Sequence, residues 1–169
     1  QIRVCARSVV NAAGPWVEAV RRLEDTSAPS LLHLSKGVHV VLPAERLPIR
    51  NIVILGAADR RSIFAIPRGD VVYLGTTDTS YTGSTDLWPT LTREDAEYLL
   101  EPIARTFDVE PVHPEECVSA WSGLRPLIAQ PGKPPTEISR RDEIWIGKAG
   151  VVSIAGGKLT GYRKMASSA

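Results

Sequence analysis

The sequence predicts an α+β fold: a mixed, largely antiparallel sheet with one helix packed on a face of it. Three observations support this prediction. Short apolar runs rich in β-branched residues recur through the middle of the chain, and one longer segment, 92–107, has helical periodicity. Thirteen glycines and thirteen prolines separate these segments as turns. A strand, a turn and a helix start are expected at each end of the chain.

The first such unit begins with apolar residues at 2–6 and 8–10, which we expect to form strand. After a turn at 11–14, apolar residues from Trp16 to Leu23 recur at helical spacing, and Pro15 suits the first helical turn.

The middle of the chain predicts strands at 37–43, 51–55, 62–67 and 71–76. A turn of hairpin length, 68–70, separates the last two of these, so we expect them to pair antiparallel.

The period then changes to that of a helix. Apolar residues recur from Ala96 through Leu99 and Ile103 to Phe107, on one continuous face. Thr92 followed three residues later by Asp95 predicts a capping arrangement at the start of the helix.

Beyond the helix, strands are expected at 116–121 and 124–128, separated by Ser122 and Gly123. The proline-rich segment 130–137 predicts a loop, and residues 144–147 and 151–155 predict two further strands.

Composition excludes several classes of function. The chain has 169 residues, 43% apolar and 23% charged, with a formal net charge of +1, so no global field favours nucleic acid. Its longest apolar run is far shorter than the roughly 18 residues of a membrane span. Cys5 and Cys117 lack metal-ligand spacing, so we expect buried free thiols and no metal site.

The segment 156–160 is the strongest candidate site. A strand that leads through Gly156 and Gly157 into a helix exposes backbone N–H groups that can hold a phosphate, a carboxylate or an anionic ring edge. A plain strand-to-helix connection explains the same spacing equally well. Lys158 and Thr160 favour a site.

His39 and Arg125 are the other candidates, each with an alternative. A histidine in a β-branched strand is more often a core or edge residue than a catalyst. Arg125, between a leucine and a proline in an apolar run, needs an anionic partner, which an internal carboxylate would also provide. Asn11 to Gly14 suits either a flat cofactor or close packing of helices.

Five motifs, taken in order, resemble the FAD-dependent glycerol-3-phosphate dehydrogenases of the aerobic type, in the D-amino-acid-oxidase-like flavoprotein superfamily. They span nearly the whole chain: VNAAGPW at 10–16, KGVHVVLP at 36–43, LGTTD at 74–78, WSGLRPL at 121–127 and GGKLTGYRK at 156–164.

The resemblance implies oxidation of sn-glycerol 3-phosphate to dihydroxyacetone phosphate, with FAD as the hydride acceptor. His39 and Arg125 would be catalytic, and Arg125 and Lys158 would bind substrate. The cofactor would be held by residues of both glycine turns, namely Ala13, Gly14, Gly156, Gly157, Lys158, Leu159 and Thr160.

It also implies a domain division: residues 1–28 and 148–169 as pieces of an FAD-binding domain, and 29–147 as a substrate-binding domain. The motif GxGxxG, which holds the adenosine diphosphate half of FAD in the family, does not occur. We therefore expect an internal fragment that alone binds FAD poorly and does not turn over.

For the parent protein, the expected partners are the small-molecule substrate glycerol 3-phosphate and a quinone or other electron acceptor, with no nucleic acid. Some homo-oligomerisation is expected, as is a cytoplasmic location, free or peripheral on the inner face of the cytoplasmic membrane. Two alternatives stay open: a related FAD-dependent oxidase of amino acids or hydroxy compounds, and a cofactor-free binding domain of the same fold.

Overall fold

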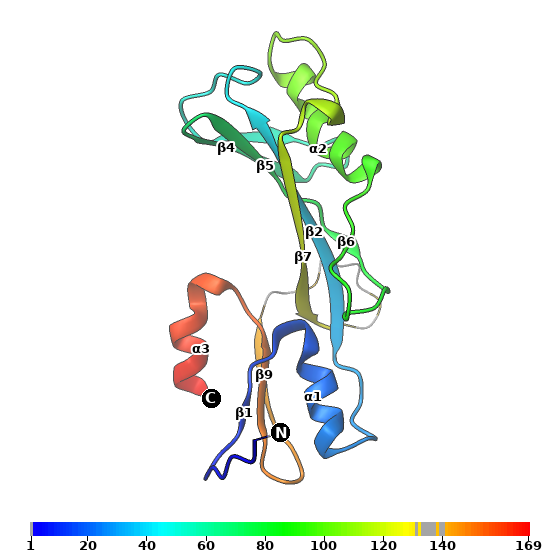
Figure 1. Cartoon of the computed structure of the whole chain (residues 1–169), viewed down its shortest axis with the longest axis vertical. Coiled ribbons are helices and arrows are strands. Elements are labelled where there is room, and N and C mark those ends of the chain that lie inside the picture. The colour runs from blue at the N-terminus through cyan, green and yellow to red at the C-terminus, as the bar shows by residue number, and fades with distance from the viewer. Residues whose placement is uncertain (1, 131, 133–137, 139–140) are drawn as a thin grey trace. The chain divides into compact units, whose positions relative to one another are not determined.

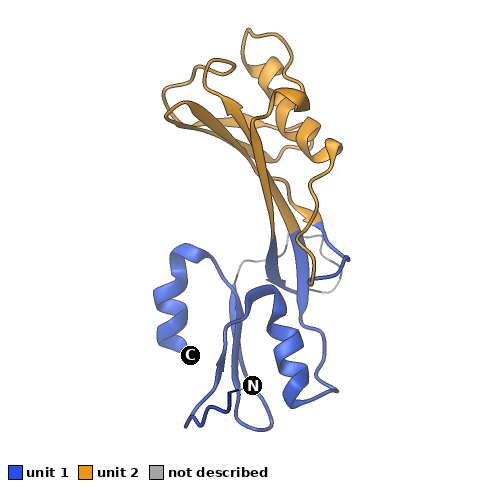
Figure 2. Cartoon of the chain, viewed as in Figure 1, with its two compact units in different colours: residues 1–35, 80–85, 124–169 blue, residues 36–79, 86–123 orange. Residues whose placement is uncertain are grey.

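The computed structural model describes residues 2–130, 132, 138 and 141–169 (Figure 1). The chain forms two compact units, coloured separately in Figure 2. Unit 1 comprises residues 1–35, 80–85 and 124–169, and unit 2 comprises residues 36–79 and 86–123. Two long strands, β2 (Leu32–Pro43) and β7 (Ser119–Ile128), contribute residues to both units.

Unit 2 contains an antiparallel sheet. Its strands are β3 (Val53–Gly56), β4 (Ser62–Arg68), β5 (Val71–Gly75) and the second half of β2, paired in that order. A two-residue strand, β6 (Thr79–Ser80), and β7 also pair with β2. The antiparallel pairing of β4 with β5 confirms the predicted hairpin, with Arg68 opposite Val71.

One helix, α2 (Arg93–Thr106), packs on this sheet (Figure 1). Thr92 and Asp95 form the predicted capping box: the Thr92 hydroxyl accepts from the Asp95 N–H, and the Asp95 carboxylate accepts from the Thr92 N–H. The same carboxylate pairs with the Lys36 ammonium at 2.5 Å, and both side chains are about nine-tenths buried. This ion pair ties the start of α2 to β2.

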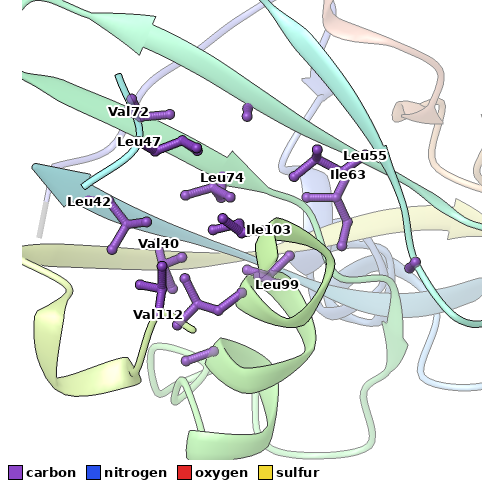
Figure 3. Close-up of a cluster of buried hydrophobic side chains, with 14 of the residues drawn as sticks. Val40, Leu42, Leu47, Leu55, Ile63, Val72, Leu74, Leu99, Ile103 and Val112 are labelled. Atoms are coloured by element: carbon purple, nitrogen blue, oxygen red, sulfur yellow. The ribbon is translucent and has the colours of Figure 1, made fainter. Parts of the chain in front are cut away.

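The core of unit 2 lies between α2 and the sheet (Figure 3). Leu99 and Ile103 of α2 are fully buried against Leu74 of β5 and Val40 of β2. The predicted apolar face of the helix is therefore the face that the sheet covers.

Unit 1 contains a three-stranded sheet in the order β1, β9, β8. β1 (Val10–Asn11) runs parallel to β9 (Val152–Gly156), and β8 (Asp142–Ile146) runs antiparallel to β9. A 3-10 turn, Gly14–Trp16, leads from β1 into α1 (Val17–Glu24). A second, Leu159–Gly161, leads from β9 into α3 (Tyr162–Ser168). Both chain ends thus contain the predicted succession of strand, turn and helix, although the first strand is only the two-residue β1.

Three expectations differ from the structure. Residues 2–9 form no strand, and Cys5 is exposed rather than buried. Ser122 and Gly123 do not interrupt β7, because Ser122 is buried and its hydroxyl donates to the Pro89 carbonyl while the ladder continues.

The expected loop at 130–137 lies almost wholly outside the described residues. The predicted domain division at 28 and 147 stays a prediction, since the compact units follow contacts within this chain alone.

Within unit 1, Glu18 fastens α1 to the segment before β2. Its carboxylate accepts hydrogen bonds from the N–H groups of Leu31 and Leu32, at 2.5 and 2.7 Å, and from the Ser30 hydroxyl. Burial alone would raise the pKa of Glu18, but these donors and the Arg22 guanidinium outweigh it and lower the pKa below its ordinary value of 4.5.

We expect Glu18→Gln to destabilise the protein by about 1–2 kcal/mol at pH 7, because the amide oxygen is a weaker acceptor than the carboxylate. A lowered folded-state pKa adds stability above the unfolded value of 4.5, and this stability is lost as the pH falls through the folded value. The difference in thermal midpoint between wild type and variant should therefore shrink below pH 4.5. Glu101→Gln, at an exposed ion pair with Arg105, is the control and should change little at either pH. An unchanged difference at low pH would contradict this account.

Candidate functional site

The carboxyl ends of the two parallel strands of unit 1 form one edge of its sheet. Asn11, at the end of β1, donates from its side-chain amide to the Ser153 hydroxyl of β9 at 3.1 Å and to the Val17 carbonyl of α1 at 2.9 Å. Its amide oxygen accepts from the Ala13 N–H at 3.3 Å. Because Asn11 is only 4% exposed, this network fixes both strands, the first turn and the following helix.

Both strands leave this edge through glycine turns. Gly14 has φ +58°, and Gly156 and Gly157 have φ +81° and +75°, a region that favours glycine. A Cβ on Gly156 would also lie within 3.0 Å of the Arg141 carbonyl oxygen. At Gly14, by contrast, a Cβ would meet no described atom within 4 Å, so this turn is open.

The residues after Gly157 are accessible. The side chains of Lys158, Leu159 and Thr160 are exposed, Leu159 to 88%. The Gly157 N–H is already bonded to the Arg141 carbonyl, while the first N–H groups of the following helical turn have no acceptor within their own helix. Open backbone donors therefore lie next to exposed side chains in the segment 158–160.

His39 belongs to unit 2, where β2 pairs with β5. Its ring is half-buried and stacks on the indole of Trp121, with ring centroids 4.8 Å apart and an interplanar angle of 8°. Tyr73 meets the same indole edge-on at 5.2 Å. The sequence gives no signal for this aromatic cluster, because 82 positions separate His39 and Trp121 and only the strand register brings them together.

The predicted site residues therefore fall into two groups. Unit 1 holds Arg125, half-buried on β7, together with every predicted cofactor residue: Ala13, Gly14, Gly156, Gly157, Lys158, Leu159 and Thr160. His39 is in unit 2. The turns of Gly14 and Gly156 are brought to one sheet edge, whereas the predicted catalytic pair is divided between the units.

Two features are absent from the described residues. Among them, no set of three or more His, Cys, Asp or Glu side chains is arranged to hold a metal ion. No helix in the described part of the chain combines the length and the apolar character that crossing a membrane requires.

A parallel strand pair with glycine turns at its carboxyl edge is the arrangement in which open α/β sheets bind ligands. The family comparison agrees with this arrangement. Residues 1–163 match the model of the DAO family, which is described as FAD dependent oxidoreductase, and the chain belongs to that family.

Among curated proteins, the chain is 50% identical over 162 residues to the aerobic glycerol-3-phosphate dehydrogenase of Staphylococcus haemolyticus and 49% identical to that of Staphylococcus aureus. Each match covers 95% of this chain and 29% of the relative. The X-ray structure of the glycerol-3-phosphate dehydrogenase from Bacillus halodurans, complexed with FAD, matches with a TM-score of 0.84 and 42% identity, over 98% of this chain and 31% of that one. The chain thus spans about three tenths of the length of these relatives.

The residues of unit 1 fit the cofactor that the family description names. A flat ring or a diphosphate needs backbone without side chains in the way, and at Gly14 and Gly161 no described atom lies within 4 Å of where a Cβ would stand. Asn11 and Ser153, both buried and bonded to each other, keep the two turns at a fixed spacing.

Local backbone geometry predicts different effects on stability at two glycines of the same turn region. Gly156→Ala should destabilise the full-length protein by about 2 kcal/mol or more, because its φ is +81° and its Cβ would strike the Arg141 backbone. Gly161→Ala should be neutral within about 1 kcal/mol, since its φ is ordinary and its Cβ would meet open space. The thermal midpoints of the two variants test this. Equal effects of the two changes would contradict it.

Proposed function

We propose that this chain is part of a flavoenzyme that oxidises sn-glycerol 3-phosphate to dihydroxyacetone phosphate. The observation that carries the proposal is the pair of glycine turns at one edge of a parallel strand pair, in a chain half identical to aerobic glycerol-3-phosphate dehydrogenases. Because the chain spans 29% of those relatives, the activity belongs to the whole protein.

FAD, when bound, accepts a hydride from the carbon that carries the secondary hydroxyl. We assign its binding to the residues of the two turns: Ala13, Gly14, Gly156, Gly157, Lys158, Leu159 and Thr160. At the Gly14 turn no described atom lies within 4 Å of where a Cβ would stand, and the exposed residues 158–160 carry backbone N–H groups that suit the polar edge of a flavin ring.

Loss of the hydride must be accompanied by loss of the hydroxyl proton. We assign the proton acceptor to His39, whose imidazole is the side chain best suited to take a proton near neutral pH. Arg125 supplies a permanent positive charge next to the oxygen, where negative charge develops as the proton leaves. Lys158 is assigned to the anionic part of the substrate, because its ammonium group is exposed beside an open turn.

We further propose that the full-length protein passes electrons to a quinone or to oxygen and forms homo-oligomers. We place it in the cytoplasm or peripherally on the inner face of the cytoplasmic membrane. Fractionation of cells that express it, with and without a salt wash, tests the location. Dye, quinone and oxygen assays in parallel identify the acceptor.

The test of the central proposal is the absorbance and the substrate-dependent dye reduction of the full-length protein, with Arg125→Ala alongside. We expect a yellow protein that is active on glycerol 3-phosphate, and about a 100-fold lower kcat/KM in the variant. Activity on amino acids but not on glycerol 3-phosphate would overturn the proposed substrate and favour an amino-acid oxidase. A colourless full-length protein would overturn the flavoenzyme proposal and favour a cofactor-free binding domain of the same fold.

A further inference from the structure

A row of residues crosses the face of the unit 2 sheet that α2 does not cover. In the register of the sheet, Phe64 lies opposite Gly75, and Gly75 lies opposite His39. The next row, which includes Val40 and Leu74, points to the other face and is buried in the core beneath α2. Because side chains alternate along a strand, His39 and its neighbours in the row lie on the face away from the helix.

Gly75 leaves room for the His39 ring. A Cβ on Gly75 would lie within 3.0 Å of both Cδ2 and Nε2 of His39. The imidazole therefore occupies the space that any other residue at position 75 would fill with its own side chain. The φ of Gly75 is not positive, so glycine is needed here for space and not for its backbone conformation.

Trp121 holds the same ring from another strand. Its indole stacks on the imidazole at 4.8 Å and 8° from parallel, and Tyr73 packs edge-on against the indole. Both are favourable aromatic geometries. The Val41 carbonyl accepts from the Val118 N–H at 2.9 Å, which fixes β7 beside β2 at this point. The His39 ring is thus confined by Gly75 of β5 and by Trp121 of β7.

We propose that Trp121 is a positioning residue for His39. Its stacked indole holds the imidazole of His39 in the space that the missing side chain of Gly75 leaves. The inference rests on the proposed function, in which His39 accepts the proton of the substrate hydroxyl. Proton transfer depends steeply on the distance and direction between the base and the hydroxyl. If the imidazole is already held in one orientation before the substrate binds, it does not have to reorient before it can accept the proton.

The experiment is a double-mutant cycle in the full-length, FAD-loaded protein, with His39→Gln, Trp121→Leu and the combined variant. We expect Trp121→Leu to lower kcat about tenfold with KM for glycerol 3-phosphate within twofold of wild type. Trp121→Phe, which keeps a stacking ring, should recover most of the loss. In the His39→Gln background, Trp121→Leu should have no further effect, because a positioning residue acts only through the residue that it positions.

Gly75→Ala perturbs the same ring from the other strand and should also lose its effect when His39 is absent. Trp88→Leu is the control, since Trp88 is 75% exposed in the same unit and should keep full activity.

A measurement independent of activity is the rate at which diethyl pyrocarbonate modifies each histidine, mapped by mass spectrometry of peptides. His39 should react several-fold faster in Trp121→Leu, whereas His113, which is exposed, should react at an unchanged rate.

The outcomes separate this inference from the proposed function. Full activity of His39→Gln would overturn the proposed role of His39, and this inference with it. A large loss in His39→Gln combined with full activity of Trp121→Leu would overturn only the positioning role. The same factor of loss from Trp121→Leu with and without His39 would also overturn it, since Trp121 would then act by a separate route.

Discussion

Replacing His39 with glutamine in the full-length protein is expected to lower kcat on glycerol 3-phosphate by about 100-fold or more, the usual contribution of a positioned general base. Glutamine approximates the size of the imidazole and can still donate a hydrogen bond, but it cannot accept a proton at neutral pH. The loss should therefore appear in kcat, while FAD content and KM change little. Steady-state dye reduction and flavin absorbance measure these quantities.

His113→Gln is the matched control, because His113 is exposed and lies in a different part of unit 2, before the short helical turn Pro114–Glu116. Its activity should equal that of wild type. If His39→Gln kept at least a third of wild-type kcat, another group would have to be the base.

The second large effect concerns stability. Leu99→Ala should destabilise unit 2 by about 3–5 kcal/mol, because Leu99 is fully buried between α2 and the sheet and its truncation leaves a cavity (Figure 3). Leu99→Met, which nearly conserves volume, should cost less than about 1.5 kcal/mol. Urea unfolding followed by far-ultraviolet circular dichroism gives both values. A cost below about 1 kcal/mol for alanine would show that this core does not support the unit.

The helix 93–106 shows how far a pattern in the sequence can reach. Its apolar residues at spacings of three and four, with Thr92 and Asp95 at its start, predicted both its bounds and its buried face. Pro102 lies inside the helix and costs it a backbone hydrogen bond, yet the proline is itself buried in the packed face. Tertiary packing of one face outweighs that local cost.

Local sequence patterns predicted the bounds of strands less reliably, because those bounds depend on pairing with another strand. Apolar residues at 2–6 resemble a strand, but in the structure only Val10 and Asn11 pair as β1. Conversely, Ser122 and Gly123 resemble an interruption, but pairing with β2 carries β7 through them. A strand exists only where a partner strand satisfies its backbone, and the identity of that partner is not encoded locally.

The candidate site likewise has features that the sequence predicts and contacts that only the structure reveals. The sequence by itself determined the hairpins, the capped helix, the glycine turns and the motifs that place the chain among FAD dependent oxidoreductases, because each depends on residues close together in the chain. Only the tertiary structure decided that Asn11 bonds to Ser153, that Lys36 pairs with Asp95, and that His39 lies between Gly75 and Trp121. These contacts join residues 36 to 142 positions apart, and strand register and packing, rather than local propensity, set which of them meet.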